Sequence, residues 1–244
     1  MKKGIDISIS GVYITGKRYL TLVKRFSTFV GQWGTIVSQP FDRRLSLDNS
    51  NTKEDIGMSL INKEVAEFSV QAYVNDEFKT VTREDILGKW SVFFFYPADF
   101  TFVCPTELED LQTKYDDFQK AGCEIYSVSC DTHFVHKAWH DNSESIGKIT
   151  FPMLADPTHE LAKDFEVLIE GQGIAERGSF IVNPEGKIVV YEVSAGNVGR
   201  NAEELFRKLQ ASQFVAEHGD QVCPARWAPG AATLKPGIDL VGAI

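Results

Sequence analysis

The hydrophobic pattern is densest at residues 92–96, where Val-Phe-Phe-Phe-Tyr forms an unbroken apolar and aromatic run. Such a run predicts a central β-strand buried on both faces, because a half-buried strand would alternate apolar and polar residues. Pro97 ends the strand, and a helical period follows, in which one face is formed by Leu108, Leu111, Tyr115 and Phe118. The sequence therefore predicts a helix that begins near residues 103–105, with Cys104 in its first turn.

The rest of the pattern predicts strands and helices in alternation. Two strands that flank Asn75-Asp76 suggest a hairpin, and Pro184-Glu185-Gly186 joins a second one. The expected strands are 68–74, 77–81, 124–129, 153–155, 179–183 and 187–193, and the expected helices are 83–87, 132–145, 159–165 and 201–217. This order indicates an α/β fold in which the strands around residues 92–96 and 124–129 pair in parallel through a right-handed crossover.

Charge and composition divide the chain into three parts. Residues 1–57 carry nine Lys and Arg against five Asp and Glu, although the whole chain has a net charge of −9. The polar segment 48–57 is typical of a linker. We therefore expect residues 1–57 to be a disordered extension or a mis-set start before Met58, and residues 58–215 to form one domain. The tail, residues 216–244, is rich in Gly, Pro and Ala and has too few apolar residues for a core of its own.

The overall composition excludes several classes of protein. A net charge of −9 argues against general binding to nucleic acids or anionic membranes, which requires clustered positive charge. No apolar run approaches the roughly 20 residues that a membrane-spanning helix needs. Four cysteines without a Cys-x-x-Cys pair suit a reducing compartment, so a cytoplasmic protein is expected.

Cys104 is the principal candidate for chemistry. At the start of a helix, free amides and the positive end of the dipole favour the thiolate, which is the nucleophilic form. The Thr101 hydroxyl could bond the sulfur or a substrate oxygen, and Pro97 could exclude water without adding a donor. Taken alone, a cysteine at a strand–helix junction is more often a buried and inert side chain.

The neighbours of Cys104 favour the chemical interpretation. Pro-x-x-x-Thr-x-x-Cys resembles the peroxidatic-cysteine motif of the peroxiredoxins, and Phe-Tyr-Pro-Ala-Asp-Phe-Thr-Phe-Val-Cys-Pro-Thr-Glu is similar to the alkyl hydroperoxide reductase C type. The resemblance extends from about Met58 to Ile244 and includes Tyr-Ser-Val-Ser-x-Asp-Thr-His-Phe, Val-Cys-Pro-Ala and Asp-Leu-Val-Gly-x-Ile. It implies a thioredoxin-like fold with an added N-terminal hairpin, and a thiol-specific peroxidase in which Cys104 becomes a sulfenic acid.

The resemblance also assigns roles to residues far from Cys104. Cys223 matches the resolving cysteine, which closes a disulfide with Cys104 of the partner subunit; otherwise it would be an incidental surface cysteine. Arg177 matches the active-site arginine, and the alternative is a solvated arginine at a strand end. Glu107 would orient that arginine, or would merely stabilise the first helical turn.

Assembly and electron supply are implied by the same resemblance. We expect a homodimer that assembles into a decamer of five dimers, and no bound cofactor. The electrons would come from NADH or NADPH through a flavoprotein disulfide reductase or thioredoxin. Two alternatives stay open: a holdase chaperone or thiol redox relay that uses the same oligomer, and a one-cysteine peroxidase that depends on an outside thiol.

Other cysteines and histidines give weaker signals. Cys123 and Cys130 flank a predicted strand and are typical of small buried hydrophobic residues. His136 and His140 share a helix face, which permits a metal site, but no carboxylate or cysteine spacing completes one. We therefore expect no metal.

Overall fold

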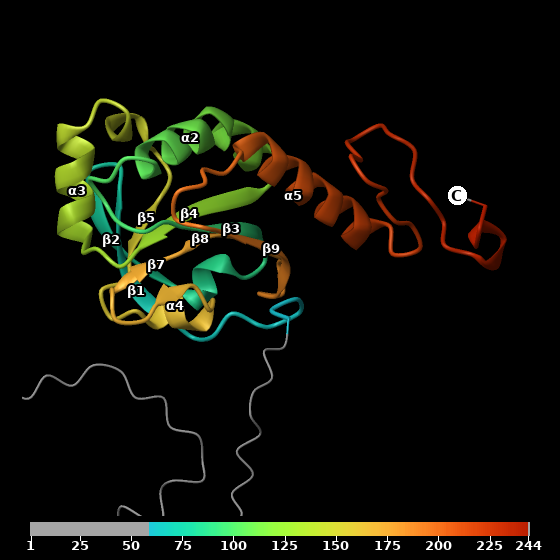
Figure 1. Ribbon diagram of the computed structural model, residues 1–244, viewed down its shortest axis with the longest axis horizontal. Helices are drawn as coiled ribbons and strands as arrows, with labels where there is room; N and C mark the ends of the chain where they lie inside the picture. Colours follow the sequence, from blue (N-terminus) through green and yellow to red (C-terminus); the bar gives the residue numbers. More distant parts are fainter. Residues whose placement is uncertain (1–58, 244) are drawn as a thin grey trace, which may run out of the picture. The chain divides into compact units, whose positions relative to one another are not determined.

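The computed structural model describes residues 59–243. The expectations for residues 1–57 and for Met58 as the natural start lie outside this range. Residues 59–243 form a seven-stranded mixed sheet in the order β2-β1-β5-β4-β3-β8-β9, and helices cover both of its faces (Figure 1). In this part of the chain, no helix combines the length and the apolar character needed to cross a bilayer.

The elements follow the predicted order. The strands are β1 Ser69–Val74, β2 Glu77–Thr82, β3 Trp90–Phe95, β4 Cys123–Ser129, β5 Met153–Ala155, β6 Leu168–Ile169, β7 Ile174–Ala175, β8 Arg177–Val182 and β9 Ile188–Ser194. The α-helices are α2 Cys104–Lys120, α3 His133–Asn142, α4 Glu160–Asp164 and α5 Ala202–Glu217, and 3₁₀ turns occupy Arg83–Ile86, Ile146–Lys148 and Ile238–Leu240.

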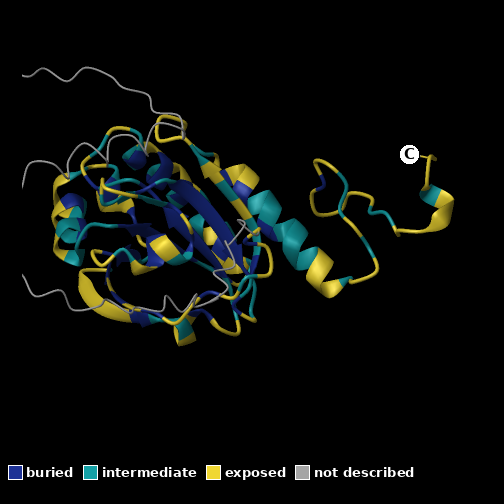
Figure 2. Ribbon diagram, turned by 60° about the horizontal axis from the view of Figure 1, so that its bottom comes forward, coloured by how far each residue is buried: buried dark blue, intermediate teal, exposed yellow. Residues whose placement is uncertain are grey.

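Strand β3 is buried on both faces, as the sequence predicts. Its side chains alternate between two hydrophobic clusters, with Phe93 and Phe95 on the α4 side and Val92 and Phe94 on the side of α2, α3 and α5. Figure 2 shows the resulting buried centre of the sheet. Because both faces are covered, no position in β3 can be polar and solvated, which explains the unbroken apolar run.

The pairing of β3 brings distant segments to one edge of the sheet. β3 runs parallel to β4, which confirms the predicted parallel pairing, and β4 runs parallel to β5. On its other side β3 pairs antiparallel with β8, so the carboxyl end of β3 lies beside the amino end of β8. The first residue of β8 is Arg177, and Cys104 follows the carboxyl end of β3.

Two local differences from the predicted elements have physical reasons. Helix α3 ends at Asn142 rather than at residue 145, because Ser143 adopts extended backbone angles and the Asn142 amide donates to the carbonyl of Ala138 (2.8 Å). Asn and Ser compete with the helix for backbone hydrogen bonds in this way. The β6–β7 hairpin was not predicted, since strands of two residues leave no alternating pattern.

The C-terminal tail packs against α5. The buried Trp227 ring lies 4.9 Å from the Phe214 ring, and the Arg207 guanidinium donates to the carbonyl of Trp227 (3.0 Å). Further along, Ile238 and Val241 are largely exposed. The tail therefore depends on the domain for its anchoring, as its composition predicts, and still presents apolar side chains to solvent.

Candidate active site

Cys104 occupies the first position of α2, and its side chain is fully buried. The residue before it, Val103, takes the N-cap position, and Pro105 follows within the first turn, where a proline loses no helical hydrogen bond. The sulfur belongs to the hydrophobic cluster that also contains Tyr96 and Leu108. A buried sulfur at a helix start confirms the position predicted from the sequence.

Arg177 lies directly beside the sulfur. Its Nη1 donates to Cys104 Sγ (3.3 Å) and to Glu107 Oε2 (2.6 Å), and its Nε donates to the carbonyl of Gly196 (2.9 Å). Only 3% of the residue is exposed, so the alternative of a solvated strand-end arginine is wrong. The antiparallel β3–β8 pair brings this cation to Cys104 from a position 73 residues away.

Glu107 connects this arginine to a second one. Its carboxylate accepts from Arg177 through Oε2 and from the Arg200 side chain through both oxygens, at 2.9 Å and 3.1 Å. The backbone N–H of Arg200 also donates to Oε1 (2.9 Å). Glu107 therefore holds both guanidinium groups in fixed positions.

Arg200 is the residue that the sequence did not reveal. It precedes α5, and its Nη1 donates to the carbonyl of Gly178 (2.8 Å) and to Ser179 Oγ (3.1 Å), while its guanidinium lies 3.4 Å from the centre of the Phe94 ring. It is separated from Glu107 by 93 residues, and a lone arginine in a loop carries no local signal of such a contact.

The charged groups beside the sulfur stabilise one another in their ionised forms. Burial alone would raise the pKa of Glu107, but the hydrogen bonds and the charge of Arg200 outweigh it and hold this pKa below its ordinary value. Burial alone would lower the pKa of Arg177, but the hydrogen bond to Cys104 and the charge of Glu107 raise it. One carboxylate thus faces two guanidinium groups, and the excess positive charge adjoins Cys104.

The two other predicted residues lie in the loop that joins β3 to α2. The Thr101 hydroxyl donates to the carbonyl of Ala98 (2.8 Å), whereas the hydrogen bond to the Cys104 sulfur comes from Arg177. Pro97 lies two residues after the end of β3 and is half-buried. Both residues therefore lie in the loop that precedes Cys104, and neither forms a hydrogen bond to its sulfur in the described part of the chain.

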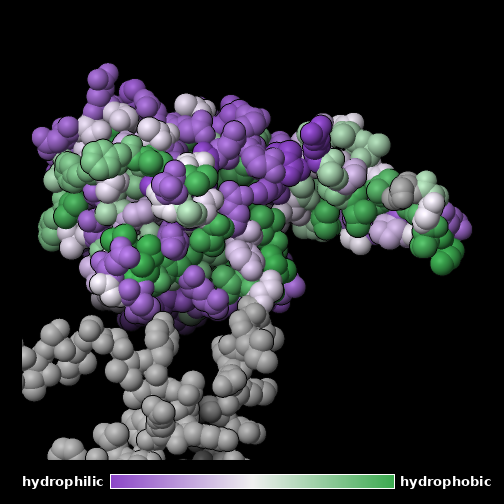
Figure 3. Space-filling model, in the orientation of Figure 1, coloured by the Kyte–Doolittle hydropathy of each residue, from purple (hydrophilic) through white to green (hydrophobic). Residues whose placement is uncertain are grey.

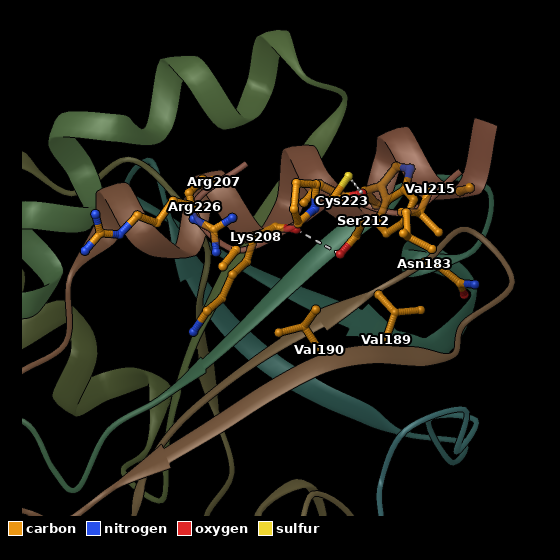
Figure 4. A pocket seen from close by; sticks show the side chains of 15 residues that line it. Asn183, Val189, Val190, Arg207, Lys208, Ser212, Val215, Cys223 and Arg226 are labelled. Atoms are coloured by element: carbon orange, nitrogen blue, oxygen red, sulfur yellow. Dashed lines mark hydrogen bonds between the residues drawn. The ribbon is translucent and has the colours of Figure 1, made fainter. Parts of the chain in front are cut away.

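Cys223 lies away from this cluster, in the tail. It is half-buried near the carbonyl of Ala211 (3.9 Å) and lines a cavity of about 640 Å³ between α5 and β9 (Figure 4). Burial raises the pKa of its thiol. All four cysteines of the chain are free thiols in this structure.

Cys123 is buried, and Cys130 is half-buried against the hydrophobic cluster on the α4 side. Burial raises the pKa of both thiols, that of Cys130 to about 12.

The ring nitrogens of both candidate metal ligands contact protein groups: those of His136 contact Asp99 and the carbonyl of Leu154, and those of His140 contact Tyr73 and the carbonyl of Ile149. Within residues 59–243, no three His, Cys, Asp or Glu side chains are arranged to hold a metal ion.

Comparison with known proteins identifies relatives that match most of the chain. The model of the AhpC/TSA family matches residues 61–191. Alkyl hydroperoxide reductase C of Staphylococcus aureus is 54% identical over 189 residues, which are 77% of this chain and all of that protein. The crystal structure of Enterococcus faecalis AhpC, at 62% identity, has a TM-score of 0.67 and covers 68% of this chain and all of that one.

A second similar structure confirms the fold at lower sequence identity. Plasmodium vivax 2-Cys peroxiredoxin in its reduced form is 30% identical, with a TM-score of 0.71, and covers 75% of this chain and 96% of that one. The α/β thioredoxin-like fold expected from the sequence, in its peroxiredoxin form, is thereby confirmed.

Glu107→Gln tests the buried ion network. The substitution leaves Arg177 and Arg200 without an anionic partner, and removing one member of a buried ion pair typically costs about 3 kcal/mol or more. We expect the free energy of unfolding, measured by denaturant titration of the reduced protein, to fall by about this amount. The matched control is Glu109→Gln, which breaks an exposed pair with Lys148 and should cost less than about 1 kcal/mol.

Glu107→Gln should also change how the free energy of unfolding depends on pH. Because the pKa of Glu107 is lower in the folded protein than its ordinary value of 4.5, its contribution to stability is fully present above that pH. The contribution is lost as the pH falls through the folded pKa. Wild-type stability should therefore decline below about pH 4.5 more steeply than that of Glu107→Gln. Parallel declines in the two proteins would contradict the assigned network.

Proposed function

The chain belongs to the AhpC/TSA family, and on this premise we propose that it is a peroxiredoxin enzyme, a thiol-specific peroxidase that reduces hydrogen peroxide and organic hydroperoxides to water and alcohols. The observation that carries the proposal is the buried Cys104 sulfur with the Arg177 guanidinium 3.3 Å away. A nucleophile paired with a fixed cation suits a reaction that leaves negative charge on a departing oxygen. Its role in the cell would be antioxidant defence and redox homeostasis.

In the first step, the Cys104 thiolate attacks one peroxide oxygen. The S–O bond forms as the O–O bond breaks, the sulfur is oxidised to sulfenic acid, and the other oxygen takes a proton from solvent and leaves as water or an alcohol. Arg177 compensates the charge that moves from sulfur to oxygen, and Glu107 keeps the guanidinium in place. Thr101 and Pro97 would position the peroxide and exclude water at the entrance.

In the second step, Cys223 of a second subunit condenses with the sulfenic acid, which gives a disulfide and water. The position of Cys223 within its own subunit supports this pairing. Helix α2 extends from Cys104 for 17 residues, about 25 Å, and Gln213 of α5 bonds the carbonyl of Ala121 just beyond its far end. Cys223 contacts α5 at Ala211, near that end.

The residues that line the cavity at Cys223 also indicate that Cys104 and Cys223 of one subunit lie far apart. It includes Trp90, the first residue of β3, whereas Cys104 follows the opposite end of this six-residue strand. A disulfide requires Cα atoms within about 7 Å. The folded subunit therefore keeps its own two cysteines far apart, and a partner subunit is the simpler source of the resolving thiol.

The cycle closes when an external reductase reopens the disulfide. We infer that the electrons originate from NADH or NADPH and arrive through a flavoprotein disulfide reductase or thioredoxin, with no cofactor bound to this chain. Such a supply and the free state of all four cysteines suit the cytoplasm.

Exposed apolar side chains support the proposed homodimer and its assembly into a decamer of five dimers. Near the active-site loop and α3, the exposed aromatic residues are Phe78, Phe100, Phe102 and Phe134. Figure 3 shows hydrophobic residues at the surface on the α3 side and along the tail. Exposed apolar side chains that gather in one region often mark protein interfaces.

A holdase chaperone or thiol relay could use the same oligomer and the same apolar surface, but the relatives favour the peroxidase. Cys104→Ser separates the two functions, because peroxidase turnover must vanish while holdase activity could survive. A one-cysteine peroxidase would keep turnover in Cys223→Ser with the natural reductase, whereas the two-cysteine cycle would stop.

The peroxidase cycle is tested by adding one equivalent of hydrogen peroxide to the reduced protein and to Cys223→Ser. Non-reducing electrophoresis and peptide mass spectrometry should show a Cys104–Cys223 dimer in the wild type and a trapped sulfenic acid on Cys104 in the variant. Cys104 that remained a thiol in both proteins would contradict the proposed function.

Phe134→Glu tests the decamer. Phe134 is 64% exposed, and its ring lies beside those of His133 (4.0 Å between ring centres) and Phe78 (5.4 Å) at the surface. The charge should therefore leave the subunit folded but disfavour burial in an interface. Sedimentation of the reduced protein should show a shift from decamers to dimers. The control Ile61→Glu, at an exposed site remote in sequence from α3, should keep the decamer; equal masses for the wild type and Phe134→Glu would refute the assignment.

A further inference from the structure

A buried polar network beneath the Cys104 loop has no part in the chemistry described above. Asp99 lies in this loop, and its carboxylate accepts a hydrogen bond from the Tyr96 hydroxyl (2.7 Å) and contacts His136 Nδ1 (2.8 Å). The other ring nitrogen, His136 Nε2, contacts the carbonyl of Leu154 (3.0 Å). Tyr96 and His136 are fully buried and Asp99 is 7% exposed, so water does not compete for these contacts.

The positions of the protons follow from the partners. The Leu154 carbonyl can only accept, so His136 Nε2 carries a hydrogen. A hydrogen bond between His136 Nδ1 and the Asp99 carboxylate then needs one hydrogen between these two atoms. Burial raises the pKa of Tyr96 well above its ordinary value, so its hydroxyl keeps its proton and donates. The network is fully satisfied, which is what makes a buried polar cluster rigid.

Asp99 is also fixed through its backbone. Its N–H donates to Asp131 Oδ2 (2.9 Å), and the same oxygen accepts from Ser129 Oγ (2.7 Å) at the end of β4. Asp99 is thus tied to three elements: to β4 through Asp131 and Ser129, and to α3 and β5 through His136. The Tyr96 hydroxyl adds a contact from the residue that follows β3.

The backbone conformation of the loop changes directly after Asp99. Phe100 has a φ of 55°, a left-handed conformation that is unfavourable for a bulky aromatic residue, and its side chain is largely exposed. Thr101 then bonds only locally, to the carbonyl of Ala98. The boundary between anchored and strained backbone lies between Asp99 and Phe100, five residues before Cys104.

We propose that Asp99 is a positioning residue, which Tyr96 and His136 hold in place, and that this anchor sets how readily the Cys104 loop opens for disulfide formation. The proposal rests on the proposed peroxidase function. The Cys104 sulfenic acid forms in a buried site, and the Cys223 thiol of another subunit can reach it only if the first turn of α2 comes away. Condensation then forms the S–S bond and releases the sulfenic oxygen as water.

The anchor should affect the two steps of the cycle unequally. Reaction with peroxide requires the closed loop, in which Arg177 contacts the sulfur, and disulfide formation requires the open loop. While the closed form predominates, a weaker anchor multiplies the small open population and hence the rate of disulfide formation. The closed population, and with it the rate of peroxide reaction, barely changes. A general loss of stability would not accelerate disulfide formation while leaving the rate of the peroxide reaction unchanged.

Tyr96→Phe provides the test, with Tyr115→Phe as the matched control. Each variant loses one phenol hydrogen bond to a carboxylate, 2.7 Å to Asp99 and 2.8 Å to Glu124, but Tyr115 lies three turns along α2 from Cys104. The reduced full-length proteins are mixed with one equivalent of hydrogen peroxide, quenched at millisecond intervals, and their thiol, sulfenic acid and disulfide forms are quantified by intact mass spectrometry.

We expect Tyr96→Phe to form the disulfide about tenfold faster than the wild type, which corresponds to one hydrogen bond to a charged group, and to react with peroxide within twofold of the wild-type rate. Tyr115→Phe should match the wild type in both steps. Unchanged disulfide formation in Tyr96→Phe, or an equal acceleration in Tyr115→Phe, would overturn the inference. Failure of wild-type Cys104 to react with peroxide would instead refute the proposed function.

Two substitutions of Asp99 extend the test should Tyr96→Phe prove unstable. Asp99→Asn can rebuild both side-chain contacts of Asp99, because the amide oxygen accepts from Tyr96 and the amide nitrogen donates to a His136 that carries a proton only on Nε2. Its disulfide step should stay within about threefold of the wild type. Asp99→Ala removes every contact of the carboxylate and should exceed the acceleration in Tyr96→Phe. An Asn variant as fast as the Ala variant would also overturn the inference.

Discussion

The hydrogen bond from Arg177 to the Cys104 sulfur depends on the burial of Glu107 between two arginines. A guanidinium taken out of water is costly unless an anion and several acceptors surround it. Glu107 supplies the anion, and the carbonyls of Gly178 and Gly196 supply further acceptors. Without this network a buried cation could not be held next to the sulfur, and Cys104 would be the inert buried thiol that its location otherwise suggests.

The sheet imposes the geometry on which this contact relies. β3 ends where α2 begins, and its antiparallel neighbour β8 starts with Arg177, so the nucleophile and the cation meet at one edge. The Asp99 network lies at the same edge of the sheet, in the loop that joins β3 to α2. Cys104, at the first position of α2, therefore contacts a fixed guanidinium and follows a loop that contains the strained Phe100. This segment must hold its shape for the peroxide reaction and open for disulfide formation.

The sequence was most informative where the structure is local. The two-sided burial of β3, the start of α2 and the hairpin at Asn75-Asp76 follow from periodicity and turn residues, and the structure has each of them. Cys104 could be identified from the sequence as the reactive residue because the residues of its motif are contiguous. Arg200 could not be identified in this way, since its partner Glu107 is 93 residues away and only the completed sheet brings the two together.

The Asp99–His136 contact illustrates the same limit. His136 could be read as a possible metal ligand on a helix face, but its two ring nitrogens are taken by a loop residue 37 positions earlier and a strand carbonyl 18 positions later. Contacts of this kind are decided by tertiary packing and leave no periodic signal.

The most direct test of the account is the reactivity of Cys104 in Arg177→Met. Arg200 would keep Glu107 paired, so the domain should remain folded while the sulfur loses its cation. If Arg177 stabilises the charge that moves from sulfur to oxygen, the second-order rate constant for reaction with hydrogen peroxide should fall by about 10²-fold or more. A rate constant within twofold of that of the wild type would contradict the central role of this contact.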